Sequence, residues 1–183
     1  MNRYQTIIDE TLKRFNDAAT PELQNILRVH SESVARKAVA VCRAHPELRA
    51  NEDLVYAGAM LHDIGIIKCD AAGIHCFGTE PYIKHGTIGA SLLSAEADIL
   101  SPNGERKDSL EALSRICARH TGTGLPGLEP ETIEEKIVCY ADKFFSKTRL
   151  DREKTYEEAR HSLMKFGEAG VKIFEEWHRA FQV

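Results

Sequence analysis

The sequence lacks any run of about 20 apolar residues, the length that a helix needs to cross a bilayer. Its first residues, MNRYQTIIDE, contain no apolar signal core. The 5 cysteines are odd in number and include no CxxC pair, which argues against a disulfide framework and a structural zinc site. We therefore expect a cytoplasmic protein with reduced thiols and no membrane partner.

The sequence also lacks a strong charge of either sign. Its formal net charge is -4 over 183 residues, and 43% of its residues are hydrophobic. These values are typical of a globular chain, and the length suits one domain over residues 1–183. The weak negative charge argues against nucleic acid as a partner, but it permits a small phosphorylated ligand because the local field of a site can oppose the net charge.

Strand signals are missing as well, and helical spacing of apolar residues dominates. We predict an all-α bundle of roughly seven helices, without strands. Thr20 and Asn51 are expected N-caps, and Gly65 is expected to end a helix by adopting positive φ. The expected helices cover residues 3–17, 20–45, 51–64, 84–97, 106–120, 131–149 and 152–180.

Two glycine-containing segments interrupt this pattern. Residues 66–82 form a long irregular loop, and its CDAAGIHC stretch lacks the fourth ligand and the spacing of a zinc site. We interpret this loop as a lid over a substrate. The TGTGLPG segment, residues 121–127, follows a helix instead of joining a strand to a helix, which excludes a P-loop or dinucleotide site.

Four histidines and two aspartates stand out within or at the ends of the expected helices. A single histidine on a helix is usually solvated or hydrogen-bonded in the core, and a single aspartate can be satisfied by a nearby donor. A buried carboxylate without a partner is unfavourable, so one shared explanation is more economical than six separate ones. Imidazoles and carboxylates together suit a divalent metal ion. The six residues are His30, His62, Asp63, His85, His120 and Asp142.

The HDIG string at residues 62–65, with His30 before it and Asp142 after it, resembles the HD-domain superfamily of metal-dependent phosphohydrolases. The resemblance covers a core of about residues 25–150, on which the N- and C-terminal helices are expected to pack. The strings KHGTIGA, RHTGTG and YAD are similar to those of bacterial HD-domain enzymes that cleave diadenosine tetraphosphate symmetrically. They also resemble uncharacterised HDIG proteins of similar length.

The resemblance implies a dinuclear site. The first metal would be held by His30, His62, Asp63 and Asp142. Asp63 would bridge to a second metal held by His85 and His120. A water shared by the two cations would attack phosphorus in a phosphoester or phosphoanhydride of a nucleotide-like substrate. Iron or manganese is the first expectation for the metals, and zinc, nickel or cobalt also suits these ligands.

Basic residues near these positions are candidates for contact with phosphate. The dinuclear enzymes commonly carry a lysine shortly after the HD pair, and this chain departs from that pattern, since Ile66 follows Gly65 and the nearest lysine is Lys68. Lys68 is therefore either a catalytic residue or a solvated one. Further along, Lys84 precedes His85, Arg119 precedes His120 and Lys143 follows Asp142, with Lys147 and Arg149 beyond it on the same expected helix. We expect substrate contacts from Lys84, Arg119 and Arg149, with a surface position as the alternative for each.

Three further alternatives remain open from the sequence. Some HD-fold relatives use a mixed-valent di-iron pair to activate oxygen on small organic substrates, with the same six ligands. A nucleotide-binding module without turnover is a second alternative. The aromatic C-terminal segment, FGEAGVKIFEEWHRAFQV, suits either core packing or the face of a homodimer.

Overall fold

The structure, a computed structural model, describes residues 3–101, 103–104, 106–122 and 126–183. It confirms the all-α class. Residues 123–125 of the glycine-rich segment lie outside the described residues. The α-helices are α1 (Gln5–Ala18), α2 (Pro21–Ala44), α3 (Glu52–Leu61), α4 (His85–Ala95), α5 (Ala97–Leu100), α6 (Lys107–Arg119), α7 (Ile133–Asp142), α8 (Tyr156–Leu163) and α9 (Glu168–Phe181). Short 3-10 turns are η1 (Pro46–Leu48), η2 (Ile64–Lys68), η3 (Ala72–Ile74), η4 (Tyr82–Lys84) and η5 (Met164–Phe166).

The helix boundaries differ from expectation at two places in the C-terminal half. The stretch expected as one helix over 152–180 is divided into α8 and α9, because Gly167 adopts a φ of 101° that only glycine takes easily. The helix expected over 131–149 ends at Asp142, and the chain then turns through residues 143–155 without regular helix. This early end determines which lysines reach the site.

The expectation of no strands was wrong for the loop over residues 66–82. Three short strands, β1 (Cys69–Ala71), β2 (Cys76–Phe77) and β3 (Glu80–Pro81), form a small sheet in the order β2-β1-β3. β1 pairs antiparallel with β2 and parallel with β3. Strands of two or three residues are too short to show an alternating apolar pattern, so the sequence gives no signal for them.

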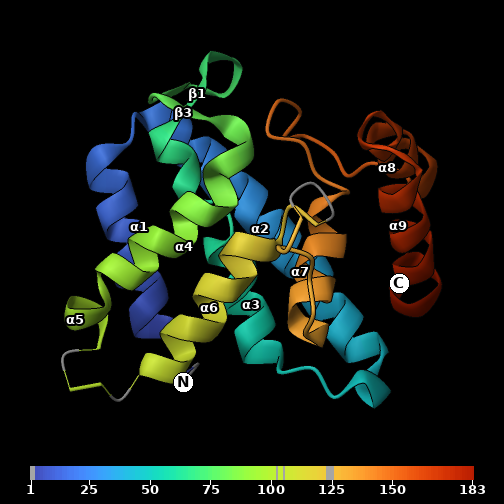
Figure 1. The fold of residues 1–183 in the computed structure, drawn as a ribbon, viewed down its shortest axis with the longest axis horizontal. Coiled ribbons are helices and arrows are strands. Elements are labelled where there is room, and N and C mark those ends of the chain that lie inside the picture. Colours follow the sequence, from blue (N-terminus) through green and yellow to red (C-terminus); the bar gives the residue numbers. More distant parts are fainter. Residues whose placement is uncertain (1–2, 102, 105, 123–125) are drawn as a thin grey trace.

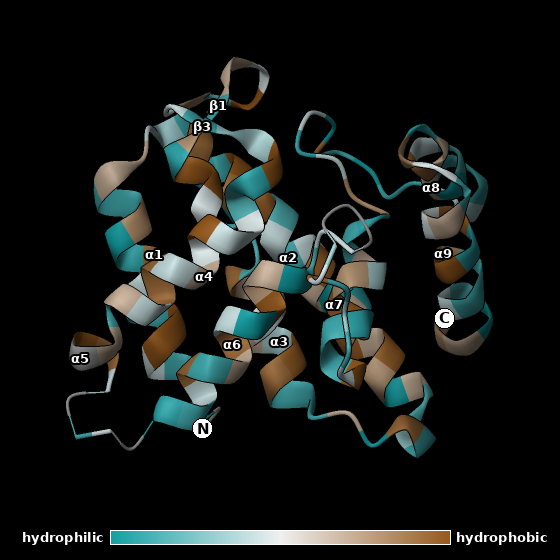
Figure 2. Cartoon of the chain, in the orientation of Figure 1, coloured by the Kyte–Doolittle hydropathy of each residue, from teal (hydrophilic) through white to brown (hydrophobic). Residues whose placement is uncertain are grey.

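The core lies between α2, α3, α4, α6 and α7, which pack on one another in the middle of the molecule (Figure 1). Apolar residues lie on the helix surfaces that face inward, and polar residues lie on the outer surfaces (Figure 2). α1 packs against α3 at one side, and α8 and α9 lie at the opposite end of the molecule, beside α7. Among the described residues, no helix is both long and apolar enough to cross a membrane.

Side-chain caps set the start of two central helices as expected. The Thr20 hydroxyl accepts a hydrogen bond from the backbone N–H of Leu23, with Pro21 in the first helical position. The Asn51 side chain accepts from the backbone N–H of Leu54 at 3.1 Å. These caps satisfy donors that an α-helix otherwise leaves open, and they begin the helices α2 and α3 that carry His30 and His62.

Gly65 does not have the positive φ that the sequence suggested. A different constraint explains glycine here: an added Cβ would lie 2.0 Å from the His85 carbonyl oxygen and 2.5 Å from the backbone nitrogen of Gly89. The turn η2 therefore touches the first turn of α4 backbone to backbone. This contact holds the segment containing Asp63 against the helix that starts with His85.

Candidate metal centre

Six structural elements contribute to one cluster of histidines and aspartates. His30 lies in the middle of α2, His62 directly follows α3, and Asp63 precedes η2. His85 is the first residue of α4. The remaining two residues stand at helix C-termini, since His120 follows α6 and Asp142 is the last residue of α7. All six side chains that the sequence singled out as metal ligands thus come together.

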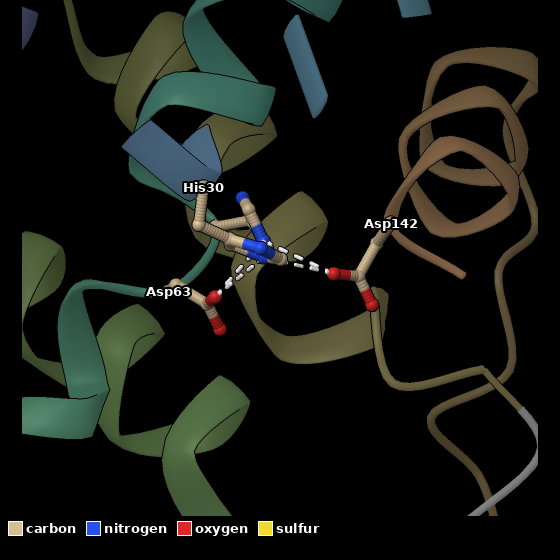
Figure 3. Close-up of side chains that lie close together, drawn as sticks. His30, Asp63 and Asp142 are labelled. Carbon is tan, nitrogen blue, oxygen red and sulfur yellow. Dashed lines mark hydrogen bonds and ion pairs between the residues drawn. The ribbon is translucent and has the colours of Figure 1, made fainter. Parts of the chain in front are cut away.

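The cluster divides into two groups that share Asp63. In the first group, His30 Nε2 lies 3.1 Å from Asp63 Oδ2 and 3.1 Å from Asp142 Oδ1. Figure 3 shows the imidazole of His30 between these two carboxylates. His62 Nε2 lies 3.1 Å from the same Asp63 oxygen and 3.2 Å from His30 Nε2.

The second group forms on the other oxygen of Asp63. His85 Nε2 lies 3.3 Å and His120 Nε2 3.4 Å from Asp63 Oδ1. The two imidazole nitrogens are 2.9 Å apart. Because Oδ2 faces the first group and Oδ1 the second, Asp63 has the geometry of a bridging carboxylate.

The separations between these atoms fit ligands arranged around a cation. Ligand atoms about 2.1 Å from a common metal ion lie roughly 3.0 Å apart in an octahedron and about 3.4 Å apart in a tetrahedron. The Nε2 and carboxylate distances of both groups fall close to that range. Neither oxygen of Asp63 accepts a hydrogen bond of good geometry among the described residues, although both are buried.

Backbone carbonyls turn the ring nitrogens of three histidines toward the centre. The Nδ1 atoms of His62, His85 and His120 lie 2.6–2.7 Å from the carbonyl oxygens of Ala59, Tyr82 and Cys117. A carbonyl oxygen only accepts, so each Nδ1 donates and each neutral ring keeps its lone pair on Nε2. Two such lone pairs at 2.9 Å repel each other unless a proton or a metal ion lies between them, and a divalent metal ion would also neutralise the carboxylates.

The pKa values of the cluster reflect burial and the opposed charges. Burial lowers the pKa of His120 to about 3, so this ring is neutral, which is the form that binds metal. Burial also lowers the pKa of His62, but the carboxylates of Asp63 and Asp142 outweigh it and raise that pKa to about 9. Despite burial, His62 and Lys147 hold the pKa of Asp63 well below its usual value.

The structure does not bring the predicted basic residues to the cluster. Lys68 is exposed, and Lys84 pairs with Glu80 at 3.2 Å. Arg119 donates to the Glu129 carbonyl and pairs with Glu131. Arg149 is exposed within the turn after α7. For Lys84 and Arg119, adjacency in the sequence to a histidine of the cluster did not bring the side chain to the cluster, because neighbouring helical side chains point about 100° apart.

Two other lysines, both from the turn after α7, lie against the carboxylates instead. Lys147 Nζ is 2.6 Å from Asp63 Oδ2, and Lys143 Nζ is 3.1 Å from Asp142 Oδ2. Both side chains are largely buried. Their positive charges, together with the histidines, balance the two aspartates at the wall of a cavity.

That cavity has a volume of about 600 Å³ and reaches from the cluster to α9. His85, His120 and Asp142 line it on the side of the cluster. Ala71, Gly73 and Ile74 of the loop over residues 66–82 also line it, and the role of this loop as a lid over a substrate stays a prediction. Cys69, His75 and Cys76 belong to neither of the two groups of potential metal ligands found among the described residues.

The chain matches the model of a known protein family. The family model for the HD domain matches residues 27–147, close to the stretch on which the sequence resemblance rests. The match covers more than half of the chain, so the chain belongs to the HD domain family. The histidine and aspartate cluster suits the divalent metal that the family's motif implies.

Curated relatives carry a different activity in their names. A tRNA (cytidine(56)-2'-O)-methyltransferase of Picrophilus torridus is 32% identical over a match that covers 66% of this chain and 32% of the relative. The protein of the same name from Thermoplasma volcanium is 30% identical over 64% of this chain and 31% of the relative. The chain thus spans about a third of the length of these relatives. A name that refers to tRNA does not fit the expectation that nucleic acid is no partner.

Proposed function

We propose that this protein is a metal-dependent phosphohydrolase that cleaves a phosphoester or phosphoanhydride of a nucleotide-like substrate. The observation that carries the proposal is the position of Asp63, whose two oxygens face two separate groups of histidines. One metal ion would be held by His30, His62, Asp63 and Asp142, and a second by His85, His120 and Asp63. Iron or manganese is the first choice, with zinc, nickel or cobalt also suited to these ligands.

The bound cations would supply Lewis acidity, which neutralises phosphoryl oxygens and makes water a nucleophile near neutral pH. The chain's own groups would orient the reacting phosphate. Lys143 and Lys147 line the cavity beside the cluster, and their ammonium groups can donate charge-assisted hydrogen bonds to phosphate oxygens. In this proposal Lys147 takes the role that the sequence suggested for Lys68.

The backbone contacts of the histidines support such a role because they fix the rings before any ligand binds. His62, His85 and His120 are each held by a carbonyl from their own helix end or turn. Rings held in this way lose little freedom when a cation arrives. The site is therefore preorganised on the protein side, and the substrate enters from the cavity lined by the loop and α9.

The test is a phosphate-release screen of the full chain, with elemental analysis of the same preparation. The substrates are mononucleotides, cyclic nucleotides, dinucleoside polyphosphates and, because of the relatives' names, tRNA. We expect release that stops after chelation and returns with manganese or iron, under anaerobic conditions as well. Asp63→Ala is the control, and it should hold no metal and release no phosphate. Oxygen uptake without phosphate release from the metal-loaded protein would contradict the proposal and favour the oxygenase alternative.

A further inference from the structure

The cavity beside the metal centre is much larger than one phosphate group needs. Its volume of about 600 Å³ lies within the roughly 300–1,000 Å³ of pockets that bury a drug-sized ligand. From the cluster it extends past the turn after α7 to η5 and α9, where Phe166 and Trp177 line it. The space and its walls thus suit a substrate with a sizeable body attached to the reacting phosphate.

Four lysines line this cavity, and they fall into two pairs. Lys143 and Lys147 contact the carboxylates of Asp142 and Asp63, as described above. Lys154 and Lys165 also line the cavity, but neither has an ion-pair contact with a carboxylate among the described residues. In contrast, Lys37, which does not line this cavity, forms an ion pair with Glu153 at 2.6 Å.

Lys154 is held close to the metal centre by the backbone. Its Nζ donates to the carbonyl oxygen of Lys143 at 3.2 Å, one residue beyond Asp142. The side chain is half-buried, and this burial lowers its pKa, as do the charges of Lys143 and Lys165, while Asp142 raises it. A half-buried ammonium group whose pKa is lowered by the charges of other ammonium groups is stabilised when an anion binds beside it.

The wall near Lys165 is apolar and open. Lys165 Nζ lies 4.8 Å from the centre of the Phe166 ring, and Phe166 is 62% exposed. Ile83, which also lines the cavity, is 45% exposed. Exposed apolar side chains that line a cavity together with ammonium groups suit a ligand that carries both an aromatic body and negative charge.

We propose that Lys154 and Lys165 form an anion subsite that binds a second phosphate group of the substrate, while Phe166 and Trp177 contact its nucleoside. This inference rests on the proposed function, because the first phosphate is the one at the metal centre. The preferred substrates are then nucleotides with at least two phosphate groups. These groups are either adjacent, as in a nucleoside diphosphate, or on separate hydroxyls, as in a nucleoside bisphosphate.

Trp177 provides a direct readout, since it is the chain's single tryptophan and it lines the cavity. The full chain is mixed rapidly with 5'-AMP, ADP or adenosine 3',5'-bisphosphate, and tryptophan fluorescence is followed before turnover. At least one of the two-phosphate ligands should bind about tenfold more tightly than AMP, because charge-assisted hydrogen bonds add affinity. ADP and the bisphosphate differ only in the position of the second phosphate, so they distinguish its two arrangements.

Variants of the two lysines test whether they cause the preference for ligands with two phosphate groups. Lys165→Gln and Lys154→Gln should each reduce the preference, and together they should bring the ratio of dissociation constants to about one. Lys165→Arg should keep the preference because it retains the charge. Lys172→Gln is the matched control, since Lys172 is exposed on the same helix as Trp177 but does not line the cavity. Circular dichroism and metal content of each variant show that the fold and the centre persist.

The outcomes separate this inference from the proposed function. Binding is measured without turnover, so a protein that prefers two phosphates but releases none supports the subsite while contradicting the hydrolase. A protein that releases phosphate but binds all three ligands equally contradicts the subsite alone. A preference that survives in the double variant also overturns the inference, because the second phosphate is then bound elsewhere.

Discussion

Replacing Gly65 by alanine should damage the metal centre, although Gly65 is not one of its six potential ligands. The new Cβ would lie 2.0 Å from the His85 carbonyl oxygen, about 1.4 Å short of the 3.4 Å at which ordinary contact begins. It would also lie 2.5 Å from the Gly89 nitrogen. Both atoms belong to the backbone of α4, so no side-chain rotation relieves the clash. Either α4 or η2 must move by roughly 1 Å.

Overpacking a core usually destabilises a protein by about 1–3 kcal/mol, and a clash with rigid backbone falls at the upper end. We therefore expect Gly65→Ala to lower the free energy of unfolding by about 3 kcal/mol. For a chain of this size, that corresponds to a decrease in Tm of roughly 6–12 °C. Because α4 starts with His85, its movement should also weaken metal binding by the group of His85 and His120.

The assay is thermal unfolding followed by circular dichroism, with and without a chelator, together with elemental analysis. Gly73→Ala is the matched control because a Cβ at Gly73 meets nothing within 4 Å, and its φ is not positive. We expect Gly73→Ala to unfold within about 2 °C of the wild-type protein. Equal Tm values for the two variants, or full metal content in Gly65→Ala, would refute the close contact between η2 and α4.

Two further substitutions test the cluster itself. His120→Ala should lose metal from the group that it shares with His85, while the group of His30, His62 and Asp142 retains its own metal. Elemental analysis should therefore show partial metal content. Complete loss of metal would mean that the two groups do not bind metal separately. Lys147→Met should raise KM for a phosphorylated substrate about tenfold, because a charge-assisted contact with phosphate is lost. Its metal content should be at least that of the wild-type protein, since an ammonium group 2.6 Å from Asp63 repels a cation on the same carboxylate, and a loss of metal would contradict this role.

That the six histidines and aspartates come together could be predicted from the sequence, because their types and order suggest a shared site. His62 and Asp63 stand side by side at the end of an apolar helix, where two polar groups need partners. His30 and Asp142 supply them from α2 and α7. The small sheet left no comparable signal, since its strands are two or three residues long. The role of Gly65 was also hidden, because the atoms it accommodates belong to a helix about 20 residues further along the chain.

For the basic residues, position along the chain does not predict which side chains reach the cluster. Lys84 and Arg119 each precede a histidine of the cluster, yet their side chains turn away to acidic or carbonyl partners. Lys147 reaches Asp63 only because α7 ends at Asp142 and the following turn doubles back over the site. A continued helix would carry Lys147 more than one turn beyond Asp142, about 7.5 Å along the axis. The end of α7 therefore decides whether Lys147 lines the cavity beside Asp63, and a lengthened helix would remove Lys147 from the cavity wall.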